Sequence, residues 1–217
     1  KFDGKTLIVS TAAPYKFIET VNFATGKEFK PFMFENVKPT IVLNKKEILD
    51  YILLSKEEAS AHASSANIGI GFDCLGIGID LENSVSFLPF DRYVLAGFEG
   101  KYNKPENNIL VKAYEYVANS IGKEIKPLFI EMKKCDVPFS RGLGSSSALI
   151  LLGVLIAKKV YEITDENLLI KLMVELEGHP DNIVPAYLGG LIVSYKVRDE
   201  IKYHQLSIND KLNFYVG

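Results

Sequence analysis

A glycine- and serine-rich loop directly in front of a long apolar run is the stretch of this sequence best suited to chemistry. It reads VPFSRGLGSSSALILLGVLIAKK, over residues 137–159. Glycines let the backbone approach a phosphate closely and adopt positive φ, and serine hydroxyls can donate to phosphate oxygens or ligate Mg²⁺. A helix beginning near Ser146 would point its unpaired N–H groups at the same place. The pattern indicates a phosphate-binding loop, with a flexible connector and a capped helix as the alternative.

A second concentration of polar side chains lies in ELEGHPDNIVPAYLGG, residues 175–190. Carboxylates, an imidazole and an amide fall within eight positions there: Glu175, Glu177, His179, Asp181 and Asn182. The spacing is not His-Glu-x-x-His, which argues against a zinc protease. A glutamate near the end of the preceding helix could give Mg²⁺ a hard oxygen ligand, and a solvated acidic helix end is the alternative. We expect a turn over residues 179–182, because a proline disfavours helix at the residue before it.

A glycine-rich turn with two polar side chains comes earlier in the chain, in NIGIGFDCLG, residues 67–76. Its first two glycines match the start of a dinucleotide-binding fingerprint, but the third would fall on Cys74. The Rossmann interpretation therefore fails at that residue. A tight turn that presents Asn67 and Asp73 to a cleft and an ordinary turn between strands both remain open.

The elements that must position these residues follow from the periodicity of the apolar side chains. Helical spacing is predicted for residues 106–124, 146–161 and 164–178. Strand patterns are predicted around the first glycine-rich turn and for residues 126–138, 188–197 and 211–217. The inward face of the first helix should carry Ile109, Ala113, Tyr116 and Val117, and Thr164 is the expected N-cap of the last helix. Strands and helices are mixed without regular alternation, which favours an α+β fold.

The composition is that of an ordinary globular protein of one or two domains. The 217 residues are 47% hydrophobic and 24% charged, with a formal net charge of −2. Because there is no basic patch, we expect no nucleic-acid partner. No apolar run approaches the ~18 residues that span a bilayer, so we expect no membrane segment. The two cysteines, Cys74 and Cys135, are too few for a disulfide framework or a zinc site, which favours reduced thiols in a cytoplasmic protein.

Three motifs in this order resemble the GHMP small-molecule kinases, and within them the homoserine kinases. ASSANIGIGFDCLG (63–76) resembles the first motif of that family, VPFSRGLGSSSA (137–148) its ATP-phosphate loop, and ELEGHPDNIVPAYLGG (175–190) its substrate-side signature. The resemblance covers about residues 58–217. It implies an N-terminal GHMP kinase domain related to the second domain of ribosomal protein S5. The C-terminal GHMP domain, with a third glycine-rich motif and a substrate-contacting arginine, would be absent from this chain.

The resemblance implies ATP-dependent phosphorylation of the L-homoserine hydroxyl, on the route to threonine. For ATP it implies Asn108, near the adenine, and the loop residues Pro138, Ser140, Arg141, Gly142, Leu143, Gly144, Ser145, Ser146, Ser147 and Ala148. For Mg²⁺ it implies Ser146 and Glu175, with Glu177 as the alternate. For homoserine it implies Asn67, Asp73, His179, Asp181 and Asn182. Positioning and charge neutralisation, rather than a strong base, would then carry much of the phosphoryl transfer.

Some features depart from the family pattern and keep other interpretations open. His62 stands where the first motif usually has proline, and Ser147 where alanine is common. If the second domain is absent, as the resemblance implies, the chain could bind nucleotide without turning over, or work as a homodimer or with a complementary C-terminal half. A GHMP kinase for another small alcohol, such as a mevalonate-type substrate, is a further alternative.

The first part of the chain, residues 1–57, is predicted to be a separate extension of the kinase domain at 58–217. A strand over Thr6–Ser10 and a short helix after Pro14 are expected there. GKTLIVSTAAPYKFIETV and FKPFMFENVKPTIVLNKKEILDYIL resemble the C-terminal tail of threonine synthase, a pyridoxal-phosphate enzyme. That resemblance would put Ser10 or Thr11 near the cofactor's pyridine nitrogen. The Schiff-base lysine would lie before Lys1, so we expect no threonine synthase activity.

Overall fold

The computed structural model describes residues 46–47, 55–69, 71–209, 211 and 214–215. The chain divides into two compact units, Lys1–Thr40 and Ile41–Gly217. All described residues belong to the second unit. The strand and helix predicted near the start of the chain, and nearly all of the segments that resemble threonine synthase, lie outside the described residues. The boundary near residue 57 and that resemblance stay predictions.

Strands and helices are mixed in the described part, which confirms the α+β prediction. In chain order they are β1 (Glu57–Asn67), β2 (Gly71–Pro89), β3 (Val94–Ala96), the 3₁₀ turns η2 (Gly100–Asn103) and η3 (Pro105–Asn107), α3 (Ile109–Ser120), β4 (Leu128–Cys135), α4 (Ser145–Val160), α5 (Glu166–Glu177), α6 (Pro180–Leu188), β5 (Leu191–Val197) and β6 (Glu200–Leu206). The sheet has the order β3-β4-β2-β5-β6, and β1 pairs with β2. The pairs are antiparallel except for β3 with β4, which run parallel.

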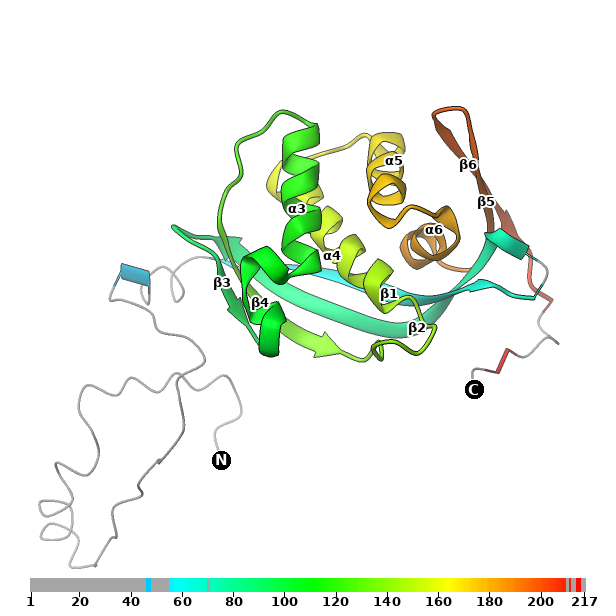
Figure 1. The fold of residues 1–217 in the computed structure, drawn as a ribbon, viewed down its shortest axis with the longest axis horizontal. Helices are drawn as coiled ribbons and strands as arrows, with labels where there is room; N and C mark the ends of the chain where they lie inside the picture. Colours follow the sequence, from blue (N-terminus) through cyan, green and yellow to red (C-terminus); the bar gives the residue numbers. More distant parts are fainter. Residues whose placement is uncertain (1–45, 48–54, 70, 210, 212–213, 216–217) are drawn as a thin grey trace, which may run out of the picture. The chain divides into compact units, whose positions relative to one another are not determined.

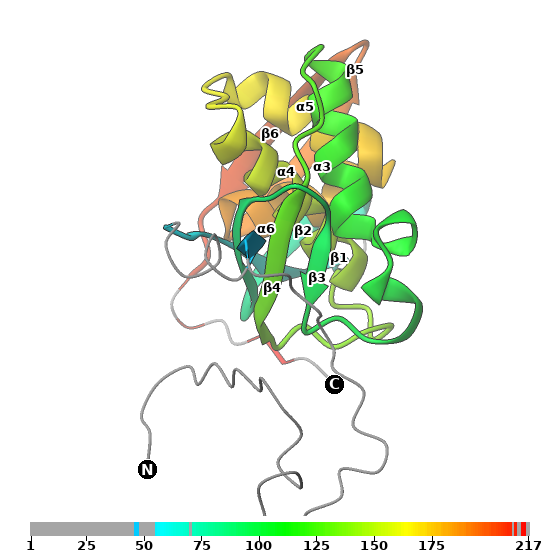
Figure 2. The ribbon, with the colours of Figure 1, turned by 90° about the vertical axis from the view of Figure 1, so that its left-hand side faces the viewer.

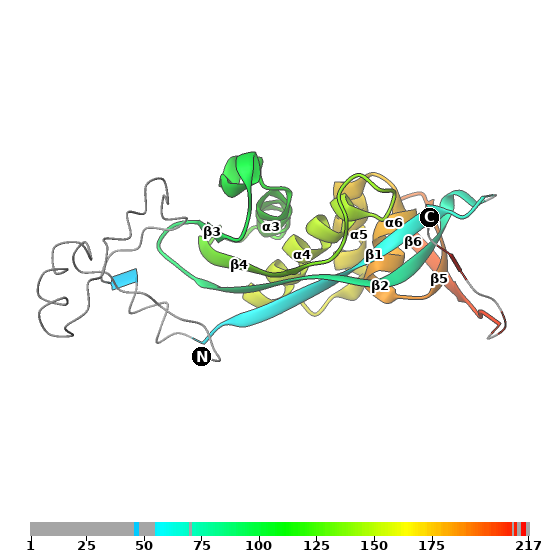
Figure 3. The same cartoon turned by 90° about the horizontal axis from the view of Figure 1, so that it is seen from below.

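The four helices α3 to α6 gather over one face of the sheet (Figures 1 and 2). Seen from below, the long strands β1 and β2 run across this helical layer (Figure 3). Helix α4 packs against β1 and against α3, α5 and α6, so apolar surroundings meet it on most sides. Ten of its 16 residues are buried. This explains why the run after the glycine- and serine-rich loop is apolar throughout instead of amphipathic.

The described elements differ from the predictions at a few points. The turn expected at residues 179–182 is wrong: α6 begins at Pro180, because proline is well suited to the first helical position. Asp165, not Thr164, caps α5, and its side chain accepts from Leu168 N. Tyr116, expected inward, is 37% exposed, and its neighbour Tyr114 is fully buried instead. The strand β6 was not predicted, and no strand forms at 211 or 214–215, the described residues of the expected terminal strand.

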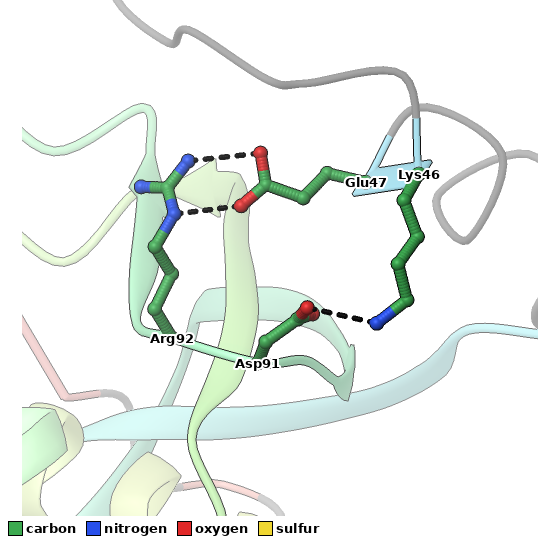
Figure 4. A network of polar contacts seen from close by, with 4 residues as sticks. All are labelled: Lys46, Glu47, Asp91 and Arg92. Atoms are coloured by element: carbon green, nitrogen blue, oxygen red, sulfur yellow. Dashed lines mark hydrogen bonds and ion pairs between the residues drawn. The ribbon is translucent and has the colours of Figure 1, made fainter.

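Two ion pairs join residues 46–47 to the turn between β2 and β3 (Figure 4). Arg92 donates from Nε to Glu47 Oε1 at 2.6 Å and from Nη2 to Oε2 at 3.1 Å. Lys46 Nζ lies 2.9 Å from Asp91 Oδ2. The Glu47 side chain is buried, whereas Lys46 and Asp91 are exposed. The bidentate pair therefore has the geometry that holds residues 46–47 against the turn between β2 and β3.

These two pairs should contribute unequally to stability. We expect Arg92→Ala to lower the free energy of unfolding by about 1–2 kcal/mol, because it removes a bidentate contact to a buried carboxylate. Lys46→Ala removes an exposed pair and should cost at most about 0.5 kcal/mol. Urea unfolding of both variants beside the wild-type chain measures the difference. Equal losses would show that the buried position of Glu47 does not matter.

Among the residues that the structure describes, no helix combines the length and the apolar character needed to cross a membrane.

Candidate functional site

The loop before α4 has the backbone of an anion-binding loop. Ser140, Gly142 and Gly144 have φ values of 56°, 72° and 63°, all in the left-handed region. Residues 138–142 are exposed, whereas Leu143 is buried and anchors the loop. Helix α4 begins at Ser145, so the unpaired N–H groups of its first turn lie where the loop ends. Successive backbone N–H groups at a helix start are suited to phosphate oxygens.

A buried serine on β1 fixes this loop to the rest of the site. Ser64 donates its backbone N–H to Leu143 O at 3.3 Å, and its side chain is inaccessible to solvent. The approach is so close that a Cβ added at Gly144 would overlap Ser64 Oγ and lie 3.2 Å from its carbonyl oxygen. The Ser64 hydroxyl donates to Asn182 Oδ1 at 3.1 Å. Ser64 therefore joins the loop to helix α6, and our sequence interpretation missed it.

The turn between β1 and β2 carries local backbone strain. Asn67, Ile68 and Asp73 have φ values of 68°, 33° and 53°, which non-glycine residues rarely adopt. The Asn67 side chain stabilises the turn by accepting from Asp73 N at 2.9 Å. Strain of this kind is concentrated at functional sites, so the turn fits the interpretation that it presents polar groups rather than simply connecting two strands.

Close packing brings this turn to the start of α6. A Cβ added at Gly76 on β2 would overlap the Asp181 carbonyl oxygen and lie 2.7 Å from Pro185 Cγ. Asp181 is 3% exposed. Burial raises the pKa of its carboxyl, the Asp73 charge raises it further, and His179 lowers it. Asp73 and His179 therefore lie close enough to influence the pKa of Asp181.

The two candidate metal glutamates point in different directions. Glu175 accepts from Tyr116 OH at 3.1 Å and lies 3.9 Å from Lys171 Nζ, on the exposed side of α5. Glu177 accepts from Ser147 Oγ at 2.6 Å, in the first turn of α4. Burial raises the pKa of Glu177, and the Ser147 hydrogen bond lowers it. The structure thus places the alternate, Glu177, beside the phosphate loop and turns Glu175 away from it.

Asn108 has a structural role at the start of α3. It is the N-cap of α3: its Oδ1 accepts from Leu110 N at 3.0 Å, and its Nδ2 donates to Tyr102 O at 2.8 Å. It also lines a cavity of about 440 Å³ with residues of the loop and the β4 side of the sheet: Gly97, Phe98, Glu99, Gly100, Lys101, Tyr102, Ile109, Met132, Cys135, Phe139 and Leu149. A largely apolar cavity of this size beside a phosphate loop is suited to an aromatic base.

The residues around the loop fit Mg²⁺ better than a metal held by protein alone. Within the described ranges, no three carboxylate, imidazole or thiol side chains gather as a metal-binding group. Mg²⁺ is usually bound by one or two protein oxygens together with phosphates and water. An exposed Ser146 hydroxyl on the first turn of α4 and the Glu177 carboxylate beside that turn are hard oxygen donors of this kind.

Comparisons of the sequence with those of known proteins identify a family of similar proteins. A family model described as the GHMP kinases N terminal domain matches residues 108–190. The chain is 36% identical over 167 residues to the homoserine kinase of Clostridium kluyveri, and this match covers 74% of this chain and 55% of that protein. It is 37% identical over 160 residues to the homoserine kinase of Thermotoga petrophila, covering 71% and 56%. Residues 108–190 are thus similar to the N-terminal domain of the GHMP kinases, and the chain has the mixed α+β fold of that domain.

A solved structure gives the same result for the fold. The structure of a candidate homoserine kinase from Listeria monocytogenes superposes with a TM-score of 0.62 at 29% identity, covering 72% of this chain and 55% of that one. The chain spans about half the length of the curated relatives it matches. The phosphate loop and the α5–α6 signature lie inside the matched range, and the Asn67 turn precedes it.

The raised pKa of Asp181 leads to a prediction about stability. A carboxyl whose pKa is raised on folding costs stability above its ordinary pKa, and that cost disappears as the pH falls through the raised value. Asp181→Asn should therefore raise the melting temperature at neutral pH by about 2 °C, and the gain should vanish in acid. Thermal unfolding at several pH values measures it. A variant that melts below the wild type at neutral pH would contradict the prediction.

Proposed function

We propose that this chain is the nucleotide- and substrate-binding half of a homoserine kinase, which transfers the γ-phosphoryl group of ATP to the hydroxyl of L-homoserine. The observation that carries the proposal is the convergence on Ser64. One buried side chain contacts the phosphate loop through Leu143 and Gly144 and the α6 signature through Asn182. A phosphate-binding loop and a cluster of polar groups suited to a small polar substrate are thereby held side by side.

The roles of the nucleotide-side residues follow from their positions. The base would occupy the cavity lined by Asn108, and the triphosphate would lie on residues 138–148, against the N–H groups at the start of α4. Ser146 and Glu177 would hold Mg²⁺, which when bound neutralises charge on the phosphates. The loop is not a Walker A motif and has no Walker lysine, because no Gly-Lys-Ser/Thr occurs in it.

The substrate-side residues suit an amino acid with a hydroxyl. The carboxylates of Asp73 and Asp181 are suited to an ammonium group, and the amides of Asn67 and Asn182, with His179, are suited to a carboxylate and a hydroxyl. In the reaction the hydroxyl oxygen bonds to the γ-phosphorus, the bond to the β–γ bridging oxygen breaks, and the hydroxyl proton is released. Holding the hydroxyl in line with that bond supplies much of the acceleration.

Nucleotide binding without turnover is a second candidate function. It needs only the loop before α4 and the cavity beside it, and not the polar groups at the start of α6. A cytoplasmic kinase of threonine biosynthesis is the setting that we propose for either case.

An ADP-release assay on the 217-residue chain with Mg-ATP tests the proposal. L-homoserine, 4-hydroxybutyrate, which lacks the amino group, and mevalonate are compared, with Ser146→Ala as the background control. ADP release that depends on homoserine and disappears in the variant is the expected result. Binding of ATP with no release would favour the second candidate. Preference for mevalonate or equal use of 4-hydroxybutyrate would overturn the assignment of the substrate.

A further inference from the structure

A hydrogen bond between two helices lies directly behind the phosphate loop. Ser147, in the first turn of α4, donates from Oγ to Glu177 Oε1 in the last turn of α5 at 2.6 Å. Ser147 is 1% exposed, and the two residues are 30 positions apart in the chain. The contact is therefore a buried tertiary link made by a hydroxyl and a carboxylate.

The bond differs from what a serine at this position in a helix usually does. Serines inside helices commonly donate to the carbonyl four residues earlier, whereas this hydroxyl donates to a charged acceptor. Hydrogen bonds to carboxylates are short and roughly twice as strong as neutral ones, and 2.6 Å lies in that range. An alanine would fill nearly the same volume, so packing alone does not require the hydroxyl.

The two neighbouring serines face different surroundings. Ser146 is exposed and Ser147 is buried, because successive helical side chains point about 100° apart. One turn of α4 therefore presents a hydroxyl to the nucleotide side and a second hydroxyl to Glu177. Both oxygen donors proposed for Mg²⁺ are then fixed relative to the same turn, Ser146 by its own backbone and Glu177 through Ser147.

We propose that Ser147 is a positioning residue that orients the Glu177 carboxylate for the Mg²⁺ of the bound nucleotide. The inference rests on the proposed function, since it requires a nucleotide–metal complex at the loop. The Ser147 hydroxyl donates to Glu177 Oε1 and thereby restricts rotation of the carboxylate. Carboxylates that ligate metals are commonly held in this way, and loss of such a partner typically weakens metal binding by about 10–100-fold.

Glu175, two residues before Glu177 on α5, provides a matched control. Tyr116 OH donates to Glu175 Oε2 at 3.1 Å on the exposed face. Tyr116→Phe thus removes a hydroxyl from a glutamate of the same helix that is turned away from the loop. Ser147→Ala removes the hydroxyl from the glutamate beside the loop. Only the second change should alter metal binding.

The experiment measures Mn²⁺ binding to the ADP-saturated chain by electron paramagnetic resonance, with ADP affinity in EDTA measured separately by calorimetry. Ser147→Ala should weaken Mn²⁺ binding about 10-fold, by more than it weakens metal-free ADP binding, and Tyr116→Phe should change neither. In a Glu177→Gln background, Ser147→Ala should have no further effect on Mn²⁺. This last result distinguishes positioning from a general structural role, which would persist in that background.

Three outcomes would overturn the inference. Wild-type Mn²⁺ affinity in Ser147→Ala would show that the hydroxyl is dispensable. An equal loss of metal-free ADP affinity, or an additive loss in the Glu177→Gln background, would show that Ser147 supports the loop and not the carboxylate. Absence of ADP binding to the wild-type chain would instead remove the proposed function itself, which the calorimetric measurement reports separately.

Discussion

Gly144→Ala is expected to weaken ATP binding by at least about 100-fold, that is by about 2.7 kcal/mol. Gly144 has a φ of 63°, and an added Cβ would overlap the Ser64 hydroxyl and press on the Ser64 backbone. Ser64 lies on β1, which is paired with β2 and packed against α4 and α6, so we expect the loop to shift instead. The N–H groups at the start of α4 would then no longer meet the phosphates.

Gly142→Ala is the matched control for this variant. Gly142 has a similar φ of 72°, but no atom lies within 4 Å of the position where its Cβ would be. It therefore carries only the left-handed strain of about 1–2 kcal/mol, without a collision. Calorimetric titration of ATP into the two variants should separate them by about 10-fold or more. Equal losses would show that contact with Ser64 does not set the loop position.

Gly153→Ala should destabilise the chain, although helix propensity alone would make it stabilising by about 1 kcal/mol. An added Cβ would overlap the Leu110 carbonyl oxygen and lie 2.7 Å from Ala113 Cβ, where α3 crosses α4. A backbone carbonyl cannot rotate away as a side chain can. We expect a loss of about 2–3 kcal/mol, the usual size of overpacking in a core.

Urea unfolding of Gly153→Ala measures this balance directly. The slope of the free energy against urea concentration should stay unchanged while the midpoint falls. A midpoint above that of the wild type would mean that α3 and α4 are less closely packed at Gly153 than in the structure. ATP affinity of the folded fraction should be retained, because Gly153 lies two turns beyond the phosphate loop.

The glutamates on α5 show what the sequence could have predicted about the site. Ile170, Met173 and Val174 are buried on α5, and Glu177 continues their spacing of three and four residues. Glu175 falls on the opposite face, four residues after Lys171. Helical periodicity therefore contained the signal that favours Glu177, whereas the family resemblance put Glu175 first.

Other parts of the site depend on contacts between distant segments, which no local pattern carries. The helix start after the loop could be predicted to within a residue, because glycines and serines precede an apolar run. The role of Ser64 arises from pairing with positions about 80 and 118 residues away. The rule that proline disfavours helix before it was right for His179, which is extended. It did not reveal that α6 begins at the proline itself.

The most direct test asks whether nucleotide and homoserine occupy one site. Relaxation of homoserine protons is measured by NMR in the presence of the chain, ADP and Mn²⁺, with Gly144→Ala and 4-hydroxybutyrate as controls. We expect faster relaxation of the protons beside the homoserine hydroxyl than of the α-proton, and loss of the effect in Gly144→Ala. No enhancement, or an equal enhancement with the variant, would contradict a shared site formed by the phosphate loop, the Asn67 turn and α6.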